Sequence, residues 1–132
     1  MAVTHSTSAQ NAATDAVTAL LGTNALLKFR LAGTIGAPGT IVANLVLSAG
    51  ASGGFGASSS GTATAGAITS DTNATGNASA VATASLQTSG GTLILHCAVA
   101  ASGSDINMTN GLIVAAADTV SCSSLTYKAL LS

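Results

Sequence analysis

The first 22 residues carry apolar side chains at the three- and four-residue spacing of an amphipathic helix. Ser6 or Thr7 can cap its start, and Gly22 is a natural stop. The apolar positions are Ala9, Ala13, Ala16, Val17, Leu20 and Leu21, and the polar positions on the other side are mainly Asn11, Thr14, Asp15 and Thr18. Such a helix either packs on its own sheet or forms an arm that docks on another subunit.

From Ala25 onward the period of the pattern changes to two. Leu27 and Phe29 alternate with Lys28 and Arg30, which is typical of a strand with one buried and one wet face. The run 41–47 is apolar on both faces apart from one asparagine, which predicts a central or covered strand. Further strands are predicted at 61–67, 78–87, 92–99, 105–109 and 119–128, with a hairpin turn at Gly90 and Gly91 and a bulge near Ser123 and Ser124.

A long tract of small residues, 48–67, separates the second predicted strand from the rest. Phe55 is its sole large side chain. Ordering so many Gly and Ser residues is entropically costly, so we expect a flexible loop that leads into a weak strand. A phosphate-cradling loop is the sharper alternative, but the tract lacks the Lys-Ser/Thr ending and the strand-loop-helix context of that motif.

These elements predict a mainly β chain, an antiparallel β-sandwich that can take the form of a jelly roll, preceded by one amphipathic helix. Strands do not alternate with helices, so nothing favours a parallel sheet. Length is that of one domain. Within it we expect residues 1–24 to form the helix or arm and residues 25–132 to form the sandwich.

Composition changes the picture because charge is so scarce. Only 5% of the 132 residues are charged, and the formal net charge is −1. A typical domain carries about a quarter of charged residues, which maintain solubility and oppose association. We therefore expect a subunit that sits against copies of itself or other subunits. No apolar run is long enough to span a membrane, and three cations (Lys28, Arg30 and Lys128) are too few to neutralise many phosphates of a nucleic acid.

The order of several short segments resembles small virion structural proteins of tailed bacteriophages. The segments are a Thr/His/Ser start at 4–8, Asn-Ala-Ala-Thr-Asp-Ala-Val at 11–17, Leu-Lys-Phe-Arg at 27–30, the Gly/Ala-rich loop at 48–67, Ala-Ile-Thr-Ser-Asp-Thr-Asn-Ala-Thr-Gly at 67–76 and Asp-Thr-Val-Ser-Cys-Ser-Ser-Leu-Thr-Tyr at 118–127. The resemblance covers most of the chain. It rests on short polar segments and on no catalytic signature, and this chain departs from the pattern by its lower charge and its two cysteines.

This resemblance implies a capsid decoration or cement protein, which binds the outer shell in many copies and bridges major capsid subunits. It also implies self-association, with a trimer as the guess, and a location on the virion. Residues 1–5 lack the basic start and apolar region of a secretory signal, so we expect synthesis in the host cytoplasm without export. The residues expected to contact the shell or another subunit are Ala9, Ala13, Val17, Leu20, Leu21, Val42, Val46 and Phe55.

The polar residues show no spacing typical of a catalytic or metal site, so we expect no enzyme activity, cofactor or metal. The four acids are scattered along the chain, and His5 and His96 have no second ligand at metal-binding spacing. A calcium site at Asp71 and Asn73 is conceivable but short of carboxylates. Cys97 and Cys122 either form one bridge or stay as buried free thiols, as a reducing cytoplasm favours.

Two other functions remain as alternatives to shell decoration. A tail- or fibre-associated adhesin would present its loops, above all 48–67, to a host-surface glycan or protein. A hydrolase acting on cell-wall polymer would need paired carboxylates or a metal cluster, and the sequence shows neither.

Overall fold

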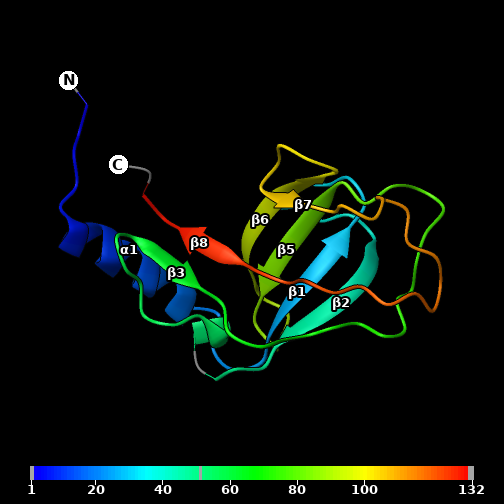
Figure 1. The fold of residues 1–132 in the computed structure, drawn as a ribbon, viewed down its shortest axis with the longest axis horizontal. Coiled ribbons are helices and arrows are strands. Elements are labelled where there is room, and N and C mark those ends of the chain that lie inside the picture. Colours follow the sequence, from blue (N-terminus) through cyan, green and yellow to red (C-terminus); the bar gives the residue numbers. More distant parts are fainter. Residues whose placement is uncertain (1, 51, 131–132) are drawn as a thin grey trace.

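The computed structural model describes residues 2–50 and 52–130, and it is mainly β with one N-terminal helix (Figure 1). Residues 1, 131 and 132, at the ends of the two predicted segments, and residue 51 of the small-residue tract lie outside the described residues. The elements are α1 (Thr7–Ala19), β1 (Ala25–Arg30), β2 (Ile41–Leu47), the short 3-10 helix η1 (Ser52–Gly54), β3 (Thr62–Thr64), β4 (Ile68–Thr69), β5 (Thr83–Gln87), β6 (Leu93–Ala100), β7 (Ile106–Asn107) and β8 (Thr126–Lys128).

Six strands form one curled sheet in the order β4-β2-β1-β5-β6-β7, and β3 and β8 form a separate two-stranded sheet. All pairings are antiparallel except the one between β6 and β7, so the larger sheet is mixed. The two-residue strand β7 follows β6 after the short connection 101–105 and pairs with it through Val99 and Ile106. The predicted mainly β class with an N-terminal helix is confirmed.

The core lies on one face of the six-stranded sheet. Leu27, Phe29 and Leu45 point into it and are almost fully buried. The second layer is the irregular C-terminal segment 108–125, drawn in orange to red, which crosses in front of the sheet in Figure 1 and contributes the buried side chains of Val114 and Val120. Each buried Leu or Phe contributes about 1.5–3 kcal/mol of hydrophobic stabilisation.

The hairpin predicted at Gly90 and Gly91 is present. β5 and β6 pair antiparallel, and the turn between them is closed by a hydrogen bond of 2.9 Å from Thr88 N to Thr92 O. Gly91 in this turn has φ +101°, a conformation that residues with a side chain rarely adopt. The glycine pair therefore has the structural role that the sequence indicated.

Four predicted strands are shorter in the structure, where 61–67, 78–87, 105–109 and 119–128 become β3, β5, β7 and β8. Residues 78–82 lie outside β5, because Val81 N donates to Leu112 O in the C-terminal segment instead of joining a ladder. Residues 119–125 are likewise not a strand, and only Val120 forms an isolated bridge, with Asp71. The tract 48–67 contains η1, β3 and the isolated bridge between Phe55 and Ala65.

Candidate attachment surfaces

Helix α1 begins where the sequence predicted, because the Ser6 side chain accepts a hydrogen bond from Ala9 N at 3.2 Å. Its exposed and buried sides do not follow the apolar pattern. Thr14 and Thr18 are buried, whereas Ala9, Ala16 and the neighbouring Leu20 are exposed. Leu20 is 61% exposed. Part of the predicted apolar side therefore faces away from the rest of the chain, whereas Leu21 is buried and Val17 is half-buried.

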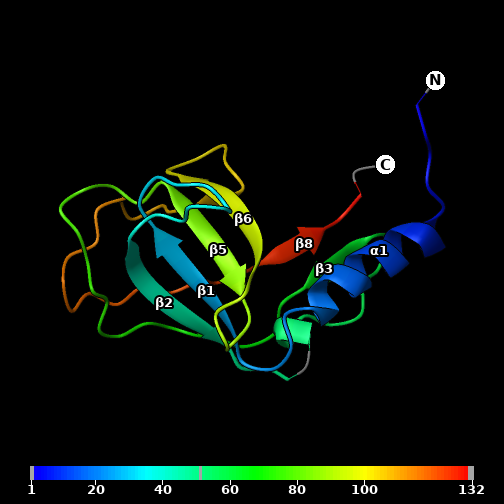
Figure 2. The same cartoon turned by 180° about the vertical axis from the view of Figure 1, so that it is seen from behind.

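Hydrogen bonds from the polar side attach α1 to the loop before β3 and to the end of β8. Thr14 Oγ1 donates to Gly61 O at 2.6 Å and accepts from Ala129 N at 3.1 Å. Asn11 Oδ1 accepts from Gly61 N at 2.7 Å, and Asp15 Oδ1 accepts from Ser58 N at 2.9 Å. Both views show α1 beside β3, at the end of the molecule away from β2 (Figures 1 and 2).

The helix thus packs on its own chain, largely through the side that the sequence pattern assigns to solvent. The expectation that its apolar side turns inward is correct for Leu21 but wrong for Ala9, Ala16 and Leu20. The physical reason is that backbone groups of the Gly/Ser-rich tract need hydrogen-bond partners, which the polar side supplies. No described residue outside the helix region covers Leu20, Ala9 or Ala16 enough to bury it. We call these three residues, with Ala13, the outer stripe of α1.

The residues expected to contact other subunits fall into two groups. Leu21, Val42 and Phe55 are buried in the core of this chain, so they do not belong to an accessible surface. The others are accessible: Ala9 and Leu20 are exposed, and Ala13, Val17 and Val46 are half-buried. The sequence pattern could not separate the two groups, because burial at each position depends on which face of the helix or strand the rest of the chain covers.

A second surface is the face of the large sheet that the C-terminal segment leaves uncovered. Figure 2 shows β2, β1, β5 and β6 from this side, with no helix or strand lying across them. We call it the open sheet face. One row across it, on four adjacent strands, consists of Asn44, which is exposed, Lys28 and His96, which are half-buried, and Ser85, which is buried. Sequence reasoning placed Lys28 on a wet face but did not identify this row.

Arg30 lies on the open sheet face and is only 7% exposed. Its guanidinium donates to Ser85 Oγ at 2.9 Å, to Gly39 O at 2.9 Å and to Gln87 Oε1 at 3.1 Å. Burial, followed by the neighbouring charge of Arg30, lowers the pKa of Lys28. Burial also lowers the pKa of Arg30. The two cations therefore lie side by side, and the three oxygens that bond Arg30 are neutral.

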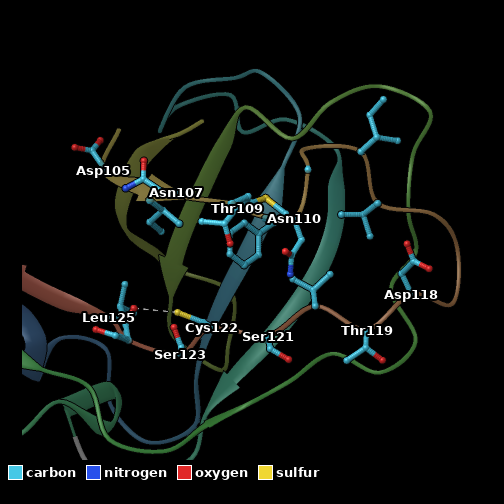
Figure 3. A pocket seen from close by; sticks show the side chains of 18 of the residues that line it. Asp105, Asn107, Thr109, Asn110, Asp118, Thr119, Ser121, Cys122, Ser123 and Leu125 are labelled. Carbon is cyan, nitrogen blue, oxygen red and sulfur yellow. Dashed lines mark hydrogen bonds between the residues drawn. The ribbon is translucent and has the colours of Figure 1, made fainter. Parts of the chain in front are cut away.

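A hollow of about 490 Å³ lies between the core face of the sheet and the C-terminal segment (Figure 3). Most of its labelled side chains are hydroxyls and amides, such as Asn107, Thr109 and Ser121. Its two acids, Asp105 and Asp118, lie at opposite ends in Figure 3, and each accepts a hydrogen bond of 2.9 Å from a backbone N–H. These carboxylates stabilise loops and are too far apart to share acid and base roles.

The two cysteines are free thiols and are not bridged. Burial, with a smaller effect of Asp105, raises the pKa of Cys97 to about 11, and burial raises the pKa of Cys122. Cys122 Sγ donates to Ser124 O at 3.3 Å at the edge of the hollow. Both thiols are neutral near pH 7 and are therefore weak nucleophiles.

The residues considered for a metal site are held apart or used otherwise. Asp71 accepts hydrogen bonds from Asn44 N and Asn73 N, at 2.8 and 2.9 Å. Among residues 2–50 and 52–130, no group of three His, Cys, Asp or Glu side chains could hold a metal ion. In the same part of the chain, no helix has the length and apolar character needed to cross a membrane.

Comparison with known proteins gives no relative: no protein family, no curated protein and no solved structure matches the chain. The functional argument therefore rests on the surfaces described above.

Proposed function

We propose that the chain is a non-enzymatic virion structural protein, a decoration protein that binds the outer capsid shell and bridges major capsid subunits. The observation that carries the proposal is the outer stripe of α1. The polar side of the helix hydrogen-bonds to its own chain, and Ala9, Ala16 and Leu20 are exposed to solvent. An apolar stripe of this kind gains free energy when a neighbouring subunit covers it.

The scarcity of charge supports the same function. With a formal net charge of −1, copies crowded on a shell would repel one another very little. A decoration protein needs no chemistry, because binding only to the assembled shell stabilises that state by mass action. Many copies also give weak single contacts a high combined avidity.

Replacement of Leu20 by Asp tests the proposal on particles of the phage that encodes this chain. Particles stripped of the protein are mixed with wild type or with Leu20→Asp, and the bound fraction is measured by sedimentation. We expect the variant to lose at least about tenfold in affinity, because a charge would be forced against an apolar partner surface. Ile113→Asp is the matched control, since Ile113 is 65% exposed and belongs to the C-terminal segment 108–125 instead of α1.

Two outcomes would contradict the proposal. One is that wild type does not return to the stripped particles or does not raise the temperature at which they open. The other is that Leu20→Asp and Ile113→Asp bind equally well. Circular dichroism of each variant shows whether the fold is retained.

The tail- or fibre-associated adhesin remains a second candidate because of the hollow behind the sheet. Its neutral hydroxyl and amide lining, including Asn107, Thr109 and Ser121, is suited to the hydroxyl groups of a glycan. Binding of the protein to a host-surface glycan array, with weaker binding by Asn107→Ala, would favour this function over shell decoration.

A further inference from the structure

We infer that the open sheet face binds carboxylate side chains of a different protein, with Lys28 as the residue that contacts them. This inference rests on the proposed function and names the chemistry of the partner surface: Asp or Glu residues of the shell subunit. It concerns a different part of the molecule from the outer stripe of α1, which lies beside β3 (Figure 2).

The positive charges on this face have no counter-ion in the described part of the chain. Arg30 is satisfied by three neutral oxygens. No carboxylate pairs with Lys28 or Arg30 within residues 2–50 and 52–130. Two neighbouring cations repel each other, so an external anion at Lys28 gains attraction from both.

A second polar group on the same face also lacks a partner. His96 occupies the same row as Lys28, two strands away across Ser85. Its Nδ1 atom is buried and has no hydrogen-bond partner among the described residues, so a partner side chain would contact the rest of the half-buried ring. Strand spacing places the two residues about 10 Å apart, which is within reach of two acidic side chains on one partner segment. Asn44, on the other side of Lys28, is exposed and adds an amide donor.

The acids of this chain are unsuitable as the occupant, which argues against a second copy. Asp15, Asp71, Asp105 and Asp118 each accept a backbone N–H of their own chain at 2.8–2.9 Å. The four acids are also at least 13 residues apart in the sequence, so no short segment of a second copy carries two of them. A pair of carboxylates on one segment must therefore come from another protein.

The face is equally unsuited to nucleic acid. Two cations neutralise at most about two phosphates, and strong binding to a nucleic acid needs several such contacts. Stacking on bases would require exposed aromatic rings, but Phe29 of β1 points to the opposite face and is 2% exposed. A few carboxylates on a folded surface match the number and spacing of these charges better.

The test uses the free, full-length protein and short peptides, so it does not depend on particles. Amide signals of Lys28, Ser85 and His96 are followed by NMR while blocked tetraglutamate is added, with blocked tetraglutamine, inorganic phosphate and oligothymidylate as comparison probes. We expect tetraglutamate to shift these signals and Lys28→Gln to weaken binding about fivefold, the effect of losing one exposed charge pair. Lys128→Gln is the matched control, because Lys128 is exposed on β8 in the smaller sheet.

Several outcomes would overturn the inference. These are the absence of shifts on the open sheet face, equal affinity of Lys28→Gln and wild type, or an equal response to tetraglutamine. Tighter binding of phosphate or of oligothymidylate would show a small-anion or nucleic-acid site instead. Failure here would leave attachment through α1 intact, whereas failure of the Leu20→Asp experiment would leave the carboxylate site intact, so the two proposals fail separately.

Discussion

Replacing Thr14 by Val should detach helix α1 without leaving a cavity. The Thr14 side chain is 0% exposed and holds two backbone groups, Gly61 O at 2.6 Å and Ala129 N at 3.1 Å. Val has nearly the same shape but makes neither hydrogen bond. A buried polar group left without a partner costs about 1–3 kcal/mol. The Gly61 carbonyl is buried and Ala129 only half-buried, so we expect a total loss of about 3 kcal/mol.

Urea unfolding followed by circular dichroism measures this loss. For a slope of about 2 kcal/mol per molar urea, the midpoint should fall by about 1.5 M. If α1 detaches locally before the sheet unfolds, the same loss appears as faster hydrogen exchange of the α1 amides. Thr7→Val is the control, because Thr7 is exposed in the first turn of the same helix, and surface substitutions usually change stability by less than about 0.5 kcal/mol. Wild-type values for both the midpoint and the α1 exchange in Thr14→Val would refute the polar attachment of the helix.

Three further predictions concern the sheet and its loops. Gly76 has φ +71°, and an added Cβ would collide with the backbone of the C-terminal segment. Gly76→Ala should therefore lower the free energy of unfolding, measured by thermal unfolding, by about 3 kcal/mol or more. Gly22→Ala is the control and should lower it by only about 1 kcal/mol, because Gly22 has φ +68° but open space around it. Ser85→Ala removes an acceptor of the buried Arg30 guanidinium and should lower the free energy of unfolding by about 2 kcal/mol; an unchanged value would contradict the network. Burial raises the pKa of Cys97 to about 11, so only about one Cys97 thiol in a thousand is ionised at pH 8. Iodoacetamide should therefore label Cys97 far more slowly in the folded chain than in the unfolded chain, and the labelling rate should rise as the pH approaches 11. Equal labelling rates in the folded and unfolded chain would contradict this burial.

The strands that the sequence predicted best are those whose two faces differ in environment. β1 (Ala25–Arg30) matches the alternation at Leu27, Lys28 and Phe29, and the run 41–47 is strand β2. The prediction of a wet position is wrong for Arg30, which is 7% exposed because its guanidinium bonds three oxygens of its own chain. The pattern failed where polar and apolar residues alternate but the backbone bonds irregularly. Residues 119–125 were predicted as part of a strand with a bulge near Ser123 and Ser124, yet they pass over the core as a loop that Val120 and Leu125 attach to it.

The candidate surfaces show a deeper limit of the sequence pattern. The amphipathic periodicity of α1 was visible, but not which side the chain would bury, because that depended on the unpaired backbone groups of the distant tract around Gly61. Likewise the alternating pattern predicted the position of Lys28 on the wet face. It could not predict that Lys28 and His96 lie in one row, because that depends on the register of three strands. Local periodicity gives the two faces of an element, and only the tertiary pairing decides what each face contacts.

The measurement that tests the proposed function most directly is the copy number of this chain in virus particles purified from cells that produce it. Quantitative mass spectrometry would compare peptides of this chain with peptides of the most abundant shell subunit. A decoration protein that bridges shell subunits should be present in numbers close to those of the shell subunit or in a fixed simple ratio to it. Only a few copies per particle, or none, would contradict the account.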